Sequence, residues 1–366
     1  MRPRRMVAGA LVVVVALFVG AGLGELGLRL FYPQPLGVWH HDRSGLAMHW
    51  PGRATYLPQF GQTVSFNSRG MRDREHPVQK PEGVFRILVL GDSFMEALQV
   101  PYERSFPSLL ERELERTTGR RVEIINASVS GWGTDDELQY LTRYGVQHAD
   151  LVLVAVTLHN DISDNLRGRF HTMKDGALVR QPIADATFWQ YKLVELKGFL
   201  ATHSHTFQLL SRARWSRQMR WEAGQLSAHV AALFRPVPDP HVARGVELTE
   251  LLLAQMQRVA AAHGSRMVLV LLPLAVQLSD DTFGELARAA TGSESGLDMR
   301  MPQRLVMGVA DRMRVPAIDL LAGFRAGAAE NGRLFVERDG HWNEAGHRLA
   351  VEIVVREMLA RGLAGT

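Results

Sequence analysis

The sequence predicts an α/β protein, a three-layer α/β/α sandwich around a central, mostly parallel, five-stranded sheet, preceded by one N-terminal transmembrane helix. Three observations lead to this expectation. From residue 85 onward, short runs of strand length alternate with amphipathic stretches of helical period. The runs are almost entirely apolar, as in strands buried on both faces of a parallel sheet. Near the N-terminus, residues 6–24 carry no charge over a length that spans a bilayer.

The predicted strands and helices follow one another along residues 85–361. Strands are expected at residues 85–90, 122–125, 151–156, 267–272 and 317–320, and helices at about 105–119, 135–144, 248–262 and 345–361. Right-handed crossovers between parallel strands place the helices on both faces of the sheet. The active site of such a fold lies at the carboxyl ends of its strands.

The composition excludes several classes of function. The 366 residues are 46% hydrophobic and 22% charged, which leaves room for a large core. The chain has no cysteine, so disulfides, thiolate metal sites and a cysteine nucleophile are excluded. The net charge of +4 is spread thinly, without a dense block of lysine and arginine, and we therefore expect no nucleic-acid partner.

The N-terminal 32 residues are interpreted as a cytoplasmic tip and a transmembrane anchor. Three arginines lie within the first five residues, before the uncharged run Met6–Gly24, which would span roughly 28 Å as a helix. Arginines favour the cytoplasmic side, so the rest of the chain is expected outside, in the periplasm or the extracellular space. A cleaved signal peptide is the alternative, because residues 20–22 are small. The length of the run and the amphipathic stretch 25–32 favour an uncleaved anchor.

Two segments do not follow the alternation of strands and helices. Residues 33–82 are rich in Pro and Gly and are interpreted as an extended linker or small β lead-in, with strand character at residues 63–66. Residues 83–366 form the main domain, with an insertion at about 165–245. In the insertion, Asp175-Gly176 indicates a hairpin turn. Residues 188–234 are expected to be mostly helical, as a lid or wall beside the active site. Their Trp189, Trp215 and Trp221 would stack on sugar rings or pack in the insertion's own core.

Four blocks of polar residues follow the predicted strands or precede the last helix. They are Gly91-Asp92-Ser93, Asn126 to Gly131, His159-Asn160-Asp161 and Asp339-Gly340-His341-Trp342. Carboxyl ends of parallel strands meet at one edge of the sheet, so the four blocks are expected to converge there. Taken singly, each has a structural interpretation: Ser93 as a helix cap, Gly131 as a turn glycine, Asn160 as a cap at a strand end. Asp92 and Asp161 are expected to bond loop N–H groups.

These blocks, in this order, resemble the SGNH/GDSL hydrolases, and residues 66–73 resemble the lead-in of the membrane-anchored bacterial members. The resemblance covers about residues 84–361, except the insertion, and implies an SGNH/flavodoxin-like fold. It implies that Ser93 is the nucleophile, His341 its general base and Asp339 the residue that orients the imidazole. The oxyanion hole would be formed by the backbone N–H groups of Ser93 and Gly131 and the side-chain amide of Asn160.

The sequence departs from the family pattern at two positions. Many members place the acid three residues before the histidine, whereas Asp339 lies two before His341. A related branch that includes alginate O-acetyltransferases has an Asp-x-His-Trp arrangement very similar to the one at residues 339–342. The glycine that often precedes the third-block asparagine is His159 here, which would change the shape of the acyl pocket.

The resemblance implies a serine-dependent esterase that cleaves carboxylic esters through an acyl-serine, on a cell-envelope or carbohydrate-linked substrate. The sequence leaves two alternatives open: an O-acyltransferase that modifies an envelope polysaccharide, and a catalytically silent envelope-binding protein. The expected partners are an ester substrate, with an acylated carbohydrate among the candidates, and the membrane. No metal and no organic cofactor is expected.

Overall fold

A parallel sheet of five strands forms the centre of the computed structural model, which describes residues 3–42, 44–181, 188–212, 230–337 and 339–365. The strands are β5 (Val84–Leu90), β6 (Arg121–Asn126), β7 (Leu151–Thr157), β10 (Arg266–Leu272) and β11 (Ala317–Asp319). They lie in the order β11-β10-β7-β5-β6, and every pair is parallel. The predicted fold class is confirmed.

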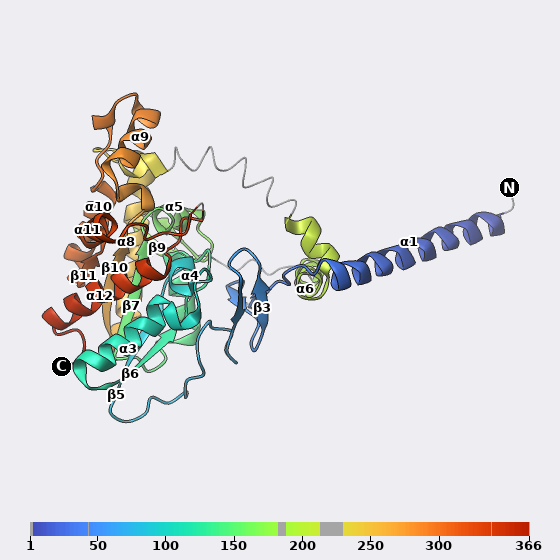
Figure 1. Cartoon of the computed structure of the whole chain (residues 1–366), viewed down its shortest axis with the longest axis horizontal. Helices are drawn as coiled ribbons and strands as arrows, with labels where there is room; N and C mark the ends of the chain where they lie inside the picture. The colour runs from blue at the N-terminus through green and yellow to red at the C-terminus, as the bar shows by residue number, and fades with distance from the viewer. Residues whose placement is uncertain (1–2, 43, 182–187, 213–229, 338, 366) are drawn as a thin grey trace.

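Helices cover both faces of this sheet (Figure 1). One apolar core lies between the sheet and α4, α8 and α10, and a second lies between its other face and α3 and α12. Because side chains alternate along a strand, Leu88 of β5 enters the first core and Ile87 the second. The helices of the domain are α2 (Ser93–Glu96), α3 (Phe106–Thr118), α4 (Thr134–Tyr144), α5 (Asp161–Asp164), α8 (Pro240–Ala262), α9 (Asp280–Thr291), α10 (Met301–Met313), α11 (Leu321–Asn331) and α12 (Glu344–Ala360), with 3₁₀ turns at Tyr102–Arg104, Asn165–Arg167, Ala275–Gln277 and Glu294–Gly296.

Helix α8 begins at Pro240, whereas the sequence predicted that this helix would start at about residue 248. The reason is a strong N-terminal signal that the prediction overlooked: Asp239 accepts the N–H groups of His241 and Val242, both at 3.0 Å, and Pro240 occupies the first helical position. Gly245 then packs so closely against the Ile162 carbonyl that a Cβ would lie 2.4 Å from its oxygen. This contact holds α8 against the segment that follows β7.

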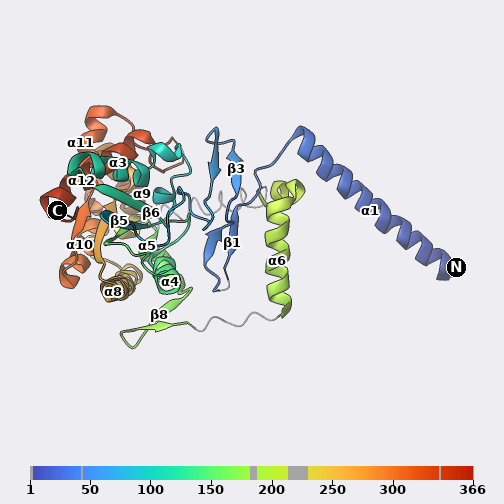
Figure 2. The ribbon, with the colours of Figure 1, turned by 90° about the horizontal axis from the view of Figure 1, so that it is seen from below.

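The lead-in, residues 33–82, contains two antiparallel strand pairs. Strand β1 (Trp39–His41) pairs with β2 (Ala47–His49), and β3 (Ala54–Leu57) pairs with β4 (Gln62–Ser65). A small core that includes Val64 and Phe66 of the lead-in also includes Leu98 of the main domain. The Trp132 indole donates to the Ala47 carbonyl at 2.8 Å, which adds a second attachment. The lead-in is therefore packed on the domain (Figure 2).

The N-terminal helix α1 (Pro3–Phe31) includes one segment apolar and long enough to cross a membrane, Val12–Phe31, of which none is buried. Its last turns contact the insertion. Glu25 accepts the N–H groups of His205 and Thr206 at 2.8 and 2.9 Å, and Arg29 donates to the His203 carbonyl at 2.6 Å. Helix α6 (Phe188–His203) thus lies at the end of α1 (Figures 1 and 2).

The position of α6 corrects the expectation of a lid or wall beside the active site. The described part of this helix lies across the lead-in from the sheet, because its contacts are with α1 and with Gly37, whose N–H donates to the Ala201 carbonyl at 2.8 Å. The hairpin was predicted correctly, as β8 (His171–Lys174) and β9 (Ala177–Arg180) flank the turn at residues 175–176. Trp215, Trp221 and the side chain of Trp189 lie outside the described residues.

Three carboxyl groups are buried together at the carboxyl edge of the sheet: Asp92, Glu137 and Asp161, with 1%, 1% and 2% of their surface exposed. Asp161 accepts the Thr157 N–H at 2.8 Å, whereas Glu137 Oε2 has no hydrogen-bond partner among the described residues. Burial, and then repulsion from Asp92 and its other acidic neighbours, raises the pKa of both Glu137 and Asp161 well above the ordinary carboxyl value.

These raised pKa values predict a loss of stability at high pH. The native state keeps protons that the unfolded chain releases, so the stabilisation is fully present below the unfolded pKa, about 4.3, and is lost as pH rises toward the folded pKa. Glu137→Gln removes one such group. Between pH 5 and pH 8, the midpoint of thermal unfolding of the full chain in detergent should fall less in the variant, by about 1–2 °C for each kcal/mol recovered.

Glu352→Gln is the matched control, because Glu352 is exposed on α12. It should reproduce the pH dependence of the wild type. An equal fall in all three proteins would contradict the assignment of a buried, protonated Glu137.

Candidate active site

Ser93 is the first residue of α2, directly after β5. The short helix is capped by Asp92, whose side chain accepts the Phe94 N–H at 3.0 Å. The cap is therefore Asp92, and the Ser93 hydroxyl does not serve as one. At Gly91, a Cβ would lie 2.7 Å from Met95 Cγ and 3.1 Å from Ala155 Cβ, so only glycine allows the chain to turn this tightly against β7.

Ser93, His341 and Asp339 form one chain of hydrogen bonds. His341 Nε2 lies 2.7 Å from Ser93 Oγ, and His341 Nδ1 lies 2.6 Å from Asp339 Oδ1. A carboxylate can only accept, so Nδ1 carries the proton and Nε2 is left to accept the Ser93 O–H. Burial favours a higher pKa for Asp339, but the hydrogen bond from His341 lowers its pKa below the ordinary value and keeps it ionised.

The loop that carries Asp339 and His341 is fixed by a turn and by an aromatic anchor. The Val336 N–H donates to the His341 carbonyl at 2.8 Å, and Gly340 has a φ of +86° that favours glycine. The next residue, Trp342, is fully buried, with its ring 5.2 Å from that of Phe94, which also lies 5.0 Å from the His341 ring. Phe94 follows Ser93, so this packing sets the imidazole relative to the serine.

Gly131 lies in the loop after β6, which runs beside the end of β5. The Val129 N–H reaches the Gly91 carbonyl at 3.4 Å, and the Trp132 N–H donates to the Val129 carbonyl at 3.1 Å. The second contact closes a four-residue turn in which Gly131 is the third residue, with a φ of +81°. This φ is typical of a type II turn, and it explains why a glycine stands there.

Asn160 precedes α5, after β7. Its amide nitrogen donates to Asp92 Oδ2 at 3.2 Å, which brings the third block beside the first. The amide has two N–H donors, so one remains for a bound group. At the neighbouring position, burial and then the charge of His341 lower the pKa of His159 to about 4, and this ring is neutral at neutral pH.

The structure thus brings the four predicted blocks to one place. Because β6 lies on one side of β5 and β7 on the other, the chain reverses its direction of winding between β5 and β7. Ligands of open parallel sheets bind at this switch point, at the carboxyl ends of the strands. Ser93 follows β5 and Asn160 follows β7, so both lie at the switch point.

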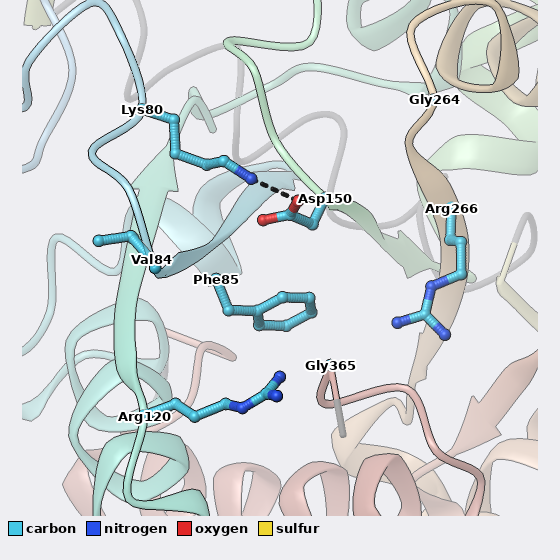
Figure 3. A pocket seen from close by; sticks show the side chains of 9 residues that line it. Lys80, Val84, Phe85, Arg120, Asp150, Gly264, Arg266 and Gly365 are labelled. Carbon is cyan, nitrogen blue, oxygen red and sulfur yellow. Dashed lines mark hydrogen bonds and ion pairs between the residues drawn. The ribbon is translucent and has the colours of Figure 1, made fainter.

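A hollow of about 630 Å³ lies at the opposite edge, at the amino ends of the strands (Figure 3). It is basic, but two of its cations have partners: Lys80 forms an ion pair with Asp150, and Arg266 donates to the carbonyls of Gly362 and Leu363. It is remote from the triad in the fold, since Val84 opens the strand that Ser93 follows. We therefore assign it no part in the chemistry.

A buried polar group that was not among the predicted site residues lies behind the Gly131 turn. Glu96 is fully buried, and its Oε2 accepts the backbone N–H of Ser130 at 2.6 Å. A glutamate within the apolar stretch Phe94–Leu98 was the only local signal. Among the described residues, no three His, Asp or Glu side chains are arranged to hold a metal ion.

Comparison with known proteins supports the same family. Residues 233–366 match the family model described as "SGNH hydrolase-like domain, acetyltransferase AlgX". A curated protein named arylesterase, from Vibrio mimicus, is 42% identical over 84 residues, which are 23% of this chain and 40% of the relative. The chain thus matches less than half the length of that relative.

Two solved structures are also similar in outline. The structure of TesA has a TM-score of 0.40 and 15% identity, with 75% of this chain and 97% of TesA covered. The acetyl xylan esterase AlAXEase has a TM-score of 0.41 and 14% identity, with 74% and 98% covered. The family model matches the part of the chain that bears Asp339 and His341. The four blocks and this match thus point to the same likeness, to an SGNH hydrolase-like domain.

Proposed function

We propose that this protein is a serine-dependent esterase that cleaves carboxylic esters through an acyl-serine. One observation carries the proposal: the continuous hydrogen-bond chain from Ser93 Oγ through His341 to Asp339, with steps of 2.7 and 2.6 Å. A serine hydroxyl becomes an effective nucleophile when an adjacent base can take its proton. The relative named arylesterase supports ester hydrolysis as the reaction type.

In the first half of the proposed reaction, Ser93 Oγ attacks the ester carbonyl carbon and its proton passes to His341 Nε2. Asp339 stabilises the imidazolium that forms. The negative charge on the former carbonyl oxygen is met by the N–H groups of Ser93 and Gly131 and by the free N–H of Asn160. The tetrahedral intermediate then collapses, and His341 returns the proton to the departing alcohol.

In the second half, water attacks the acyl-serine. His341 takes a proton from the water and gives it to Ser93 Oγ as the ester bond breaks, so that the acid leaves and the free serine is restored. Each preorganised oxyanion donor contributes about 3–4 kcal/mol of transition-state stabilisation. The chemistry needs no group beyond these side chains and backbone donors.

An O-acyltransferase is the second candidate, because the matched family model includes an acetyltransferase in its description. It would share the acyl-serine and differ only in the acceptor, a sugar hydroxyl in place of water. Giving the full chain p-nitrophenyl acetate with and without an oligosaccharide separates the two. Acylated oligosaccharide in the mass spectrum supports the transferase, and free acetate alone supports the esterase.

We further propose that α1 anchors the domain on the extracytoplasmic face, where the substrate would be an envelope or carbohydrate-linked ester. The positive N-terminus supports this orientation. The membrane-embedded part would end near Gly24, because Glu25 and Arg29 bind backbone groups at residues 203–206. Those polar contacts belong outside the hydrocarbon core.

Ser93→Ala should abolish turnover, with a fall in kcat of about 10⁴-fold or more, because no nucleophile remains. A fluorophosphonate probe should label the wild type and fail to label Ser93→Ala, and His341→Ala should label far more slowly. Ser108→Ala, on α3, is the control and should behave as the wild type. A folded wild type that resists the probe, beside a reactive control esterase, would favour the silent binding protein.

Asn160→Ala should lower kcat by about 10²- to 10³-fold with little change in KM, because the amide acts on charge that develops only in the transition state. Steady-state kinetics on p-nitrophenyl acetate measure both constants. A change confined to KM would remove Asn160 from the proposed oxyanion hole and make it a substrate-binding residue.

The mature protein should keep its N-terminal helix. Intact mass measurement of protein extracted from the membrane fraction should give the full chain, and external protease should digest the catalytic domain in spheroplasts. A mature N-terminus near Gly24 would instead show that the segment is a signal peptide.

A further inference from the structure

The lead-in is attached to the loops that carry the catalytic residues. The Arg72 guanidinium, 3% exposed, donates to the carbonyls of Glu96 at 2.7 Å, Ala97 and Val100 at 2.6 Å, which follow Ser93 in the chain. The Ala47 carbonyl binds the Trp132 indole, just after Gly131. The segment that follows Ser93 and the segment that follows Gly131 are therefore both held by residues outside the α/β domain.

A buried ion pair lies at the centre of this contact. His49 Nε2 of β2 lies 2.8 Å from Glu96 Oε1, and both side chains are fully buried. On its other side, His49 Nδ1 lies 3.2 Å from the Gly70 carbonyl, and the ring stacks on Phe66 with centroids 4.0 Å apart. Each ring nitrogen of His49 thus lies close to an oxygen atom that can only accept.

The second oxygen of Glu96 holds the turn that carries Gly131. Oε2 accepts the Ser130 backbone N–H at 2.6 Å and also the Ser130 hydroxyl. Burial opposes ionisation of Glu96, but the charge of His49 and these hydrogen bonds lower its pKa below the ordinary value. The carboxylate is therefore charged, and it can accept from both partners at once.

The Ser130–Gly131 peptide is the central peptide of the turn. Type I and type II turns differ mainly in which way this peptide faces, and the φ of +81° at Gly131 is the type II value. Glu96 fixes Ser130, so it selects the direction in which the Gly131 N–H points. Without a counter-charge, a buried carboxylate would protonate and lose acceptor strength. His49 supplies a counter-charge that lowers the pKa of Glu96, and the buried Arg72 guanidinium also attracts this carboxylate.

We propose that His49 is a positioning residue of the active site, which acts through Glu96 and Ser130 to aim the Gly131 N–H at the oxyanion. The lead-in is then part of the catalytic unit. This inference rests on the proposed esterase function. A buried ion pair that only stabilises the fold is the competing explanation, and the chain contains a matched control for it.

The control is the ion pair of His76 and Asp73, also in the lead-in and also buried, with side chains 2% and 1% exposed and 3.0 Å between Nε2 and Oδ2. Its carboxylate accepts from the Tyr102 hydroxyl at 2.6 Å and from the Asn126 N–H at 2.8 Å, within β6. The pair of His76 and Asp73 is thus a buried histidine–carboxylate pair like that of His49 and Glu96, but its carboxylate does not bind Ser130.

His49→Gln and His76→Gln are compared in the full chain with p-nitrophenyl acetate. His49→Gln should lower kcat about 10- to 100-fold with KM within about 2-fold, because one oxyanion donor is misdirected and not deleted. His76→Gln should leave kcat within about 2-fold, although both variants lower the unfolding midpoint. An equal fall in kcat in the two variants, or an unchanged kcat in His49→Gln, would overturn the proposal.

Two further measurements keep the test decisive. If His49→Gln does not fold, Ser130→Ala should still lower kcat, whereas Ser128→Ala, whose buried hydroxyl has no partner among the described residues, should not. If the wild type turns over no ester, the proposed function fails. Hydrogen exchange of the peptide 129–133 then decides the inference alone. His49→Gln should speed exchange there and His76→Gln should not, and equal exchange in both would reject the role of His49.

Discussion

The pairing of β5 between β6 and β7 is the constraint on which the site depends. Val89 pairs with Asn126 and Leu90 with Val154, so three consecutive strands of the chain end at one edge in fixed register. Parallel strands expose their carboxyl ends together. Any slip along β5 would carry Ser93 away from the loops after its neighbours. The fourth block comes from outside these strands and is attached separately, by the burial of Trp342 against Phe94.

Two buried carboxyl groups near the site, Glu96 and Glu137, differ in protonation although they are equally buried: the first is ionised and the second is neutral. Glu96 lies beside His49 and accepts two hydrogen bonds from Ser130, and its pKa is lowered. Glu137 faces Asp92 and Asp136, and its pKa is raised well above the ordinary value. Burial penalises the charge in both, so the neighbours decide. The same edge of the sheet thus holds one fixed negative charge behind the Gly131 turn and keeps a second acid, near Asp92 and Asp161, neutral.

The sequence predicted the elements whose signals are local. Each apolar run in the sheet was visible as a run, and the resemblance of the four blocks to a known family predicted the partners that the structure brings together at Ser93. What it missed is non-local. Nothing near His49 indicates a partner at Glu96, because the contact depends on how the lead-in folds over α2. The N-terminus of α8 was missed for a different reason: Asp239-Pro240 is a local signal, but it lies in a proline-rich stretch that reads as a loop.

The lead-in also limits the freedom of the catalytic domain. Glu25 at the end of α1 binds residues 205 and 206, Gly37 binds Ala201, and the following strands are packed on the domain through Leu98 and Trp132. These contacts restrict the movement of the domain relative to α1, which a flexible linker would allow. If α1 spans a membrane as proposed, the serine works at a set height above the lipid surface. The proposed esterase would then act on esters at that distance from the membrane, because its domain could not move freely as it would on a flexible linker.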